Sequence, residues 1–111
     1  MVTCTSSRVP FLGANDVCPG TFVAAVGADN ERKSEIAASL LSRARIVTDL
    51  TAQCLKSGDL RNAVPNEANV CGELVDVVSK RVPRTGADEI VVFDSSGLAV
   101  EDLALCALIC D

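Results

Sequence analysis

Short apolar runs, each closed by a glycine or a polar residue, recur along the chain and predict four β-strands. Continuous apolar runs of this length, bounded by turn residues, are typical of strands that are buried on both faces of a parallel sheet. A stretch rich in proline, glycine and asparagine at 8–20 predicts a loop after the first strand. The predicted strands are "MVTCTSS" at 1–7, "TFVAAVG" at 21–27, "ARIVTD" at 44–49 and "DEIVVFDSSG" at 88–97.

Between these runs the apolar positions follow a helical period. Residues 31–45 place their apolar side chains on one face, and Asp29 or Asn30 is a suitable N-cap for such a helix. The segment 98–111 is apolar nearly all round, so we expect that helix to be buried or paired. Further helices are predicted at 50–58 and 69–82.

The alternation of strands and helices predicts an α/β fold. We expect a mostly parallel sheet of about four strands with flanking helices, because parallel strands need crossover connections and these are usually helical. A chain of 111 residues predicts a single domain spanning residues 1–111.

Small and hydroxyl-bearing residues follow each predicted strand. In an open parallel sheet, ligands bind beyond the carboxyl ends of the strands, so these residues are candidate ligand contacts. The same residue types also form turns and helix caps, and both interpretations stay open here. The strand-end segments are Thr5-Ser6-Ser7, Gly27-Ala28-Asp29, Thr48-Asp49 and Asp94-Ser95-Ser96-Gly97.

Neither phosphate-binding glycine motif is present in the chain. The sequence contains no G-x-G-x-x-G dinucleotide fingerprint and no G-x-x-x-x-G-K-[ST] loop. By motif alone, the residues therefore do not indicate a nucleotide.

Charge and composition exclude several classes of protein. The net charge of −5 and the isoelectric point of about 4.6 argue against nucleic-acid binding, which needs a basic surface. No apolar run approaches the ~18 residues of a membrane span, so none is expected. We expect a cytoplasmic protein, since the N-terminus lacks the features of a secretory signal.

The absence of histidine narrows the possible chemistry. Ser-His-Asp and Cys-His nucleophilic arrangements cannot be built from this chain alone. The six cysteines are widely spaced without a Cys-x-x-Cys pair, so no metal site is predicted and reduced thiols are expected.

Several stretches together resemble the C-terminal part of the ornithine cyclodeaminase/mu-crystallin family, over nearly the whole chain. The most specific are "AVGAD" followed by K-x-E, and E-I-x-V-F-D-S-x-G-x-A-x-x-D. The resemblance implies the second half of an NAD(P)-binding Rossmann domain, with the N-terminal half and the dimerisation and substrate domain absent. The stretches, in order, are "VTCTSS", "PGTFVAAVGADNERKSEI", "ARIVTD", "SGDL", "GELVDVVS" and "DEIVVFDSSGLAVEDLA".

The resemblance also implies roles for individual residues. Asp29 matches the acid that follows "AVG", which is catalytic in cyclodeaminase-like members of the family. The positions that match cofactor-adjacent segments are Thr5, Ser6, Val26, Gly27, Ser96 and Gly97. Three further acids at recurrent family positions are expected to be structural: Glu35, Asp59 and Glu73.

Two functional expectations follow from the resemblance. The family chemistry is NAD(P)-dependent reduction of ketimines or pyrroline-2-carboxylate, or ornithine cyclodeamination, on a small ligand derived from an amino acid. We expect this chain alone to be catalytically silent, since the phosphate-binding half of the cofactor site is missing. The alternative is a functional subunit that a separate upstream segment completes.

Self-association is the expectation for partners. The first strand would lie beside a missing strand in a full Rossmann sheet, so its edge is expected to be exposed. We therefore expect a homodimer or oligomer joined through the first strand or the last helix.

Overall fold

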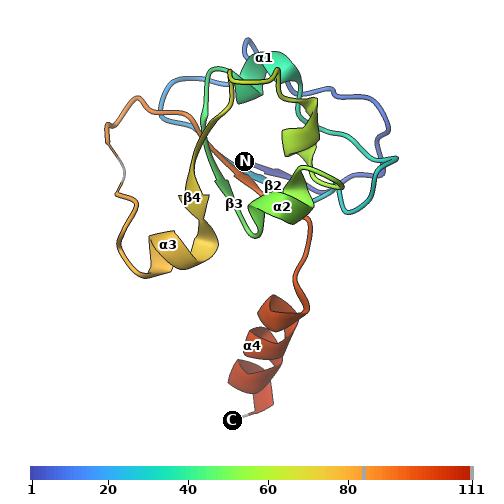
Figure 1. The fold of residues 1–111 in the computed structure, drawn as a ribbon, viewed down its shortest axis with the longest axis vertical. Coiled ribbons are helices and arrows are strands. Elements are labelled where there is room, and N and C mark those ends of the chain that lie inside the picture. Colours follow the sequence, from blue (N-terminus) through green and yellow to red (C-terminus); the bar gives the residue numbers. More distant parts are fainter. Residues whose placement is uncertain (84, 111) are drawn as a thin grey trace.

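A computed structural model describes residues 1–83 and 85–110 and places a five-stranded, fully parallel sheet at its centre. The strand order is β1-β2-β5-β3-β4, so β1 lies at one edge, as expected, and β5 is inserted between β2 and β3 (Figure 1). The α/β, mostly parallel fold is confirmed. The strands are β1 Val2–Thr3, β2 Phe22–Ala25, β3 Arg45–Thr48, β4 Asn69–Glu73 and β5 Val91–Asp94.

The prediction of about four strands is one strand short, because the segment 69–82 is not a single helix. Its first part is β4, which pairs with β3, and only Leu74–Val78 forms a helix, α3. The apolar positions of the second half follow a helical period. The first half carries Val70 and Gly72, and both residue types have a low helix propensity. The pairing shifts register next to Gly72, whose φ of 155° lies in a region that glycine tolerates.

The predicted helix at 31–45 is also wrong over its first half. Only Ala38–Leu41 forms a helix, α1, and its N-cap is Ala37 instead of Asp29 or Asn30. Residues before it run extended, and Ile36 forms a parallel bridge with Leu12. The amphipathic pattern was real, since Ile36, Leu40 and Leu41 are all buried, but tertiary hydrogen bonds replace the helical ones over this stretch.

One face of the sheet carries the core. This face is covered by α1, α2 (Thr51–Cys54) and the 3₁₀ helix η1 (Asp59–Asn62). The loop that contains Leu12 and Val17 also contributes to the core. The fully buried apolar side chains of the core are Val23, Ile36, Leu40, Leu41, Ile46, Cys54 and Val92. The packed face therefore fixes how the strands align and brings their carboxyl ends to one edge.

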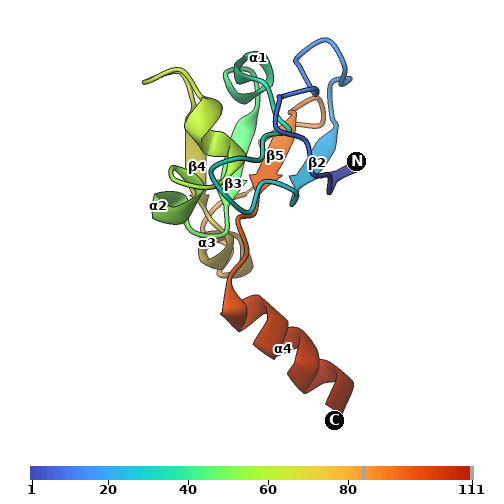
Figure 2. The ribbon, with the colours of Figure 1, turned by 90° about the vertical axis from the view of Figure 1, so that its right-hand side faces the viewer.

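The last helix, α4 (Ala99–Cys110), forms as predicted but projects away from the body (Figure 2). None of its residues is buried, so the expected burial is not met within this chain. Exposed fractions reach 68% for Leu103, 79% for Leu108 and 74% for Ile109. In the part of the chain that the structure describes, no helix combines the length and the apolar character that crossing a membrane would need.

Candidate functional site

The six predicted cofactor-facing residues lie at the carboxyl ends of three neighbouring strands. The border of the sheet that these strand ends form is called the cofactor-facing edge below, and it is distinct from the edge strand β1. Thr5 and Ser6 follow β1, Val26 and Gly27 follow β2, and Ser96 and Gly97 follow β5. Because β1, β2 and β5 are adjacent and parallel, their carboxyl ends meet at this edge. The sequence-based grouping of these residues is therefore compatible with the observed strand order.

A single buried carboxylate joins the ends of β1 and β2. Glu35 is fully buried, and its Oε1 accepts the backbone N–H of Thr5 at 2.5 Å. Its Oε2 accepts the backbone N–H of Gly27 at 3.1 Å. Glu35 therefore holds the two strand ends together, since one of its oxygens bonds to each of them.

A second buried carboxylate holds the end of β5. Asp49, at the end of β3, accepts the N–H of Gly97 at 2.8 Å and the hydroxyls of Ser95 at 3.1 Å and Ser96 at 3.3 Å. The Ser95 N–H in turn donates to the Ala25 carbonyl at 2.9 Å, which links β5 to β2. The Ser96 hydroxyl is thus held by Asp49.

Two more acids lie beneath this edge, and their environment disfavours the charged form. Burial raises the pKa of Asp94 to about 6, and the nearby Asp59 and Asp49 charges act in the same direction. Burial likewise raises the pKa of Asp59, whose Oδ2 lacks a hydrogen-bond partner in the structure. Burial therefore favours the neutral form of both acids.

The raised pKa of Asp94 gives an expected pH dependence of stability. An acid whose pKa is higher in the folded chain than the ordinary 3.8 contributes stability at low pH, which is lost as the pH rises through about 6. The free energy of unfolding is expected to fall by about 1 kcal/mol between about pH 5 and about pH 7. Urea denaturation at both pH values measures this change.

The Asp94→Asn variant serves as the control for that dependence, because it has no carboxyl group to titrate. Its unfolding free energy is expected to change less over the same interval. An identical slope in the variant and the natural chain would show that Asp94 is not the group responsible.

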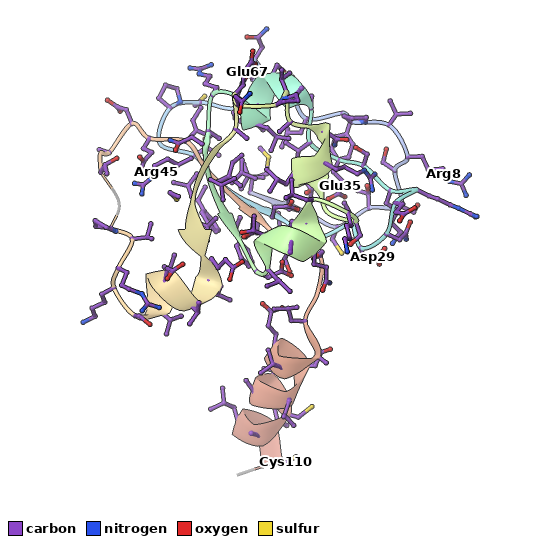
Figure 3. All side chains as sticks on the ribbon, in the orientation of Figure 1. Arg8, Asp29, Glu35, Arg45, Glu67 and Cys110 are labelled. Carbon is purple, nitrogen blue, oxygen red and sulfur yellow. The ribbon has the colours of Figure 1, made fainter. Side chains whose placement is uncertain are left out.

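Asp29 lies on an exposed turn two residues beyond Gly27. Its side chain is 54% exposed and forms an ion pair with Lys33, Nζ to Oδ2 at 3.0 Å. The Asn30 side chain donates to the other carboxylate oxygen at 2.7 Å. These hydrogen bonds, that from Lys33 foremost, hold the pKa of Asp29 below its usual range. In this chain Asp29 is an ionised carboxylate facing solvent, well away from Arg45 (Figure 3).

Two basic residues, to which the sequence alone assigns no role, fix this turn. Lys33 forms an ion pair with Asp29, and the spacing of four residues between them is a sequence signal for such a pair. Arg61, from η1, donates to the Asn30 carbonyl at 3.0 Å and to the Lys33 carbonyl. No sequence signal indicates the second contact, because it joins segments that are 31 and 28 residues apart.

The geometry of the edge suits the nicotinamide end of a dinucleotide better than its phosphates. The backbone N–H groups of Thr5, Gly27 and Gly97 are already bonded to carboxylates, so they are not free to bind an anion. Gly97 has a φ of 88°, and no heavy atom lies within 4 Å of the position that a Cβ would take there, so the space above it is open. Nearby acids favour a flat cationic ring over a pyrophosphate.

Among the described residues, no three cysteine or acidic side chains lie close enough together to hold a metal ion.

Comparison with known proteins gives a consistent picture. The family model described as "Ornithine cyclodeaminase/mu-crystallin family" matches residues 1–111. The chain is 36% identical to the iminosuccinate reductase of Paracoccus denitrificans over 108 residues, which covers 95% of this chain and 34% of that protein. It is 34% identical to the ketimine reductase mu-crystallin of Rattus norvegicus over 112 residues, covering all of this chain and 34% of that protein.

Solved structures agree with the sequence matches. An archaeal alanine dehydrogenase dimer with bound NAD superposes with a TM-score of 0.85 at 32% identity, covering 97% of this chain and 35% of that one. The Paracoccus denitrificans iminosuccinate reductase in complex with NAD⁺ gives a TM-score of 0.83 at 37% identity, with coverages of 96% and 34%. The chain thus spans about a third of the length of these relatives.

Proposed function

Because the chain belongs to the ornithine cyclodeaminase/mu-crystallin family, we propose that it forms the nicotinamide-facing half of an NAD(P)-binding Rossmann domain. The proposed reaction class is NAD(P)-dependent reduction of an imine derived from an amino acid, or the related cyclodeamination. The observation that carries this proposal is the convergence of Thr5, Val26, Gly27 and Ser96 on one sheet edge.

When bound, a nicotinamide cofactor exchanges a hydride with the substrate, and the protein supplies orientation and electrostatics. The ends of β2 and β5 present a surface on which a flat ring can rest, because Gly97 has no side chain there and Val26 is 37% exposed. Thr5 and Ser6 border this surface at the β1 side, and both are exposed.

We assign the catalytic carboxylate to Asp29. It lies beside the proposed ring surface, it is exposed to an approaching substrate, and its oxygens are ionised and held in place by Lys33 and Asn30. An ionised carboxylate at this place accepts a proton or orients a water next to the substrate's reacting carbon. Closure over the site by substrate would remove water from Asp29 and raise its pKa towards the range that general acid–base catalysis needs.

By itself, this chain is proposed to be catalytically silent. The strand-end N–H groups are engaged by Glu35 and Asp49, and no glycine-rich phosphate loop is present in the sequence. A cofactor that is held only at its nicotinamide end loses the backbone hydrogen bonds and the helix-dipole attraction that normally bind its pyrophosphate. The missing contacts would come from the N-terminal half of the domain, either within a longer chain or from a separate segment.

A hybrid enzyme tests the proposed function directly. Residues 1–111 would replace the matching third of the Paracoccus denitrificans reductase, and the hybrid is expected to oxidise NADH or NADPH with the imine substrate of that enzyme. Calorimetric titration of the isolated chain with either cofactor is expected to show no binding in the micromolar range. A folded hybrid without cofactor binding or turnover contradicts the proposed function, and micromolar binding by the isolated chain contradicts the proposed silence.

Self-association through α4 is proposed as the quaternary arrangement of the isolated chain. An isolated helix of 12 residues is marginal in water, and this one exposes Leu103, Leu108 and Ile109. Light scattering at about 100 µM is expected to show a dimer or larger species, since micromolar association would be nearly complete there. Replacing these three residues with lysine is expected to give a monomer.

The β1 edge provides the comparison for the helix. Val2, which is 69% exposed on that edge, would be replaced with lysine in a second variant. If only this change dissociates the protein, the interface lies at the edge strand. A natural chain that is monomeric with a cooperative melt would contradict self-association altogether.

The free cysteine thiols are relevant to the cellular location of the protein. All six cysteines are unpaired, and four of them, Cys4, Cys18, Cys106 and Cys110, are exposed. Exposed, reduced thiols persist in reducing compartments, so we propose a cytoplasmic location. Of the remaining two, Cys54 is buried and Cys71 is partly buried.

A further inference from the structure

Three fully buried carboxylates form a series that runs under the candidate site. Glu35, Asp59 and Asp94 each have 0% exposure, and none of them pairs with a basic side chain in the described residues. Burying a charge without an opposite charge is costly, so other contacts must offset it. In all three cases those contacts include two backbone N–H groups.

The series begins at the end of β5. Asp94 accepts the N–H of Asp59 at 3.1 Å and the N–H of Leu60 at 2.7 Å, which fixes the start of η1. Asp59 then accepts, on its Oδ1, the N–H of Glu35 at 2.8 Å and the N–H of Ile36 at 3.0 Å. Each carboxylate therefore holds the backbone of the next acid in the series.

The series ends at the proposed cofactor-facing edge. Glu35 accepts the N–H groups of Thr5 and Gly27, which lie two residues beyond the ends of β1 and β2. The backbone of Glu35 has no helical turn to fix it, because its N–H points at Asp59 and its carbonyl accepts Phe11 and Leu12. The position of the Glu35 carboxylate thus depends on Asp59, and that of Asp59 depends on Asp94.

We propose that Asp94, Asp59 and Glu35 are positioning residues that act in series to place Thr5 and Gly27 at the cofactor-facing edge. The assignment of that edge rests on the proposed function; the coupling between the three acids does not. The physical reason for carboxylates at these places is that one carboxylate can accept two N–H groups from irregular backbone: Glu35 and Asp94 accept one on each oxygen, and Asp59 accepts both on Oδ1. An apolar side chain would leave those groups buried and unpaired.

Amide hydrogen exchange of the isolated chain, followed by NMR, tests the series without cofactor or substrate. In Asp94→Asn, exchange at Thr5 and Gly27 is expected to rise at least about tenfold, although Asp94 touches neither residue. Exchange at core amides such as Val92 is expected to stay near its natural rate. A purely structural role for Asp94 would instead raise exchange at all protected amides together.

Glu73→Gln is the matched control. Glu73 is a partly buried acid that accepts the N–H of Thr51 at 2.9 Å at a neighbouring strand end, outside the series. Its variant is expected to change the Thr51 amide and leave Thr5 and Gly27 unchanged. The proposal is overturned if Asp94→Asn changes only Asp59 and Leu60, or if it accelerates exchange uniformly.

The natural chain supplies a second test that does not require a variant to fold. The amide shifts of Thr5 and Gly27 are expected to follow the titration of the Asp94 carboxyl, which is surrounded by the titratable groups Asp59, Asp49 and Cys54. Shifts that follow only the exposed acids would overturn the series. Because cofactor plays no part in either measurement, failure here leaves the proposed function standing, and an inactive hybrid enzyme leaves the series standing.

Discussion

Replacing Gly27 with alanine is expected to lower the free energy of unfolding by about 3 kcal/mol, the range for leaving buried charged and backbone groups unpaired. A Cβ at this position would lie 2.2 Å from Oε1 and 2.6 Å from Oε2 of Glu35. The carboxylate cannot swing aside cheaply, because it holds the N–H groups of Thr5 and Gly27 in a fully buried place. Chemical denaturation of both proteins measures the difference.

Gly86→Ala is the control for the loss of a glycine as such. Among the described residues beyond its two chain neighbours, no heavy atom lies within 4 Å of a Cβ at Gly86, so this change is expected to stay within about 0.5 kcal/mol of the natural chain. A double variant of Gly27→Ala with Glu35→Ala should be less unstable than the sum of the two single changes, because the clash disappears. Natural stability in Gly27→Ala would show that Glu35 does not occupy the observed position.

The Asp29→Asn change in the hybrid enzyme is expected to lower kcat by about 10²- to 10⁴-fold, the usual contribution of a positioned acid or base. Asparagine keeps the size of the side chain but can neither accept a proton at neutral pH nor pair with Lys33. The unfolding free energy is expected to change little, because the ion pair with Lys33 is largely exposed. Steady-state kinetics at saturating substrate, with a denaturation curve, separates the two effects.

Glu67→Gln is the comparison for that experiment. Glu67 is an exposed acid far from Asp29 (Figure 3), so its variant removes one negative charge without touching the proposed site. Its kcat is expected to match that of the unsubstituted hybrid. Equal rates for the Asp29 variant and the unsubstituted hybrid would remove the catalytic role of Asp29 and leave the cofactor-facing edge in place.

The fold was predictable from the sequence wherever a segment's pattern and its environment agreed. The runs at 21–27, 44–49 and 88–97 became β2, β3 and β5, and the apolar stretch at 98–111 became α4. The prediction failed where local pattern and tertiary contacts disagreed. The amphipathic period of 31–45 became a helix only over Ala38–Leu41, because upstream N–H groups bond to distant acceptors.

The candidate site was predictable to a similar degree. Strand-end position identified the residues at the edge, and the acids Glu35 and Asp59 were expected to be structural. Their partners were not predictable, since no spacing rule relates Glu35 to Thr5 or Asp59 to Glu35. The interpretation of Asp29 as a helix cap was wrong for the same reason, because the turn is fixed by Arg61 instead of by a following helix.

By itself, the sequence determined the parallel α/β class, the strand-end residues and the family, because apolar runs and turn residues act over short separations along the chain. Only the tertiary structure decided the fifth strand, the exposed setting of Asp29 and the series of buried carboxylates. Five of the six backbone hydrogen bonds of that series join residues 23 to 35 positions apart. Such bonds form only after the sheet has brought the segments together, and no local pattern encodes them.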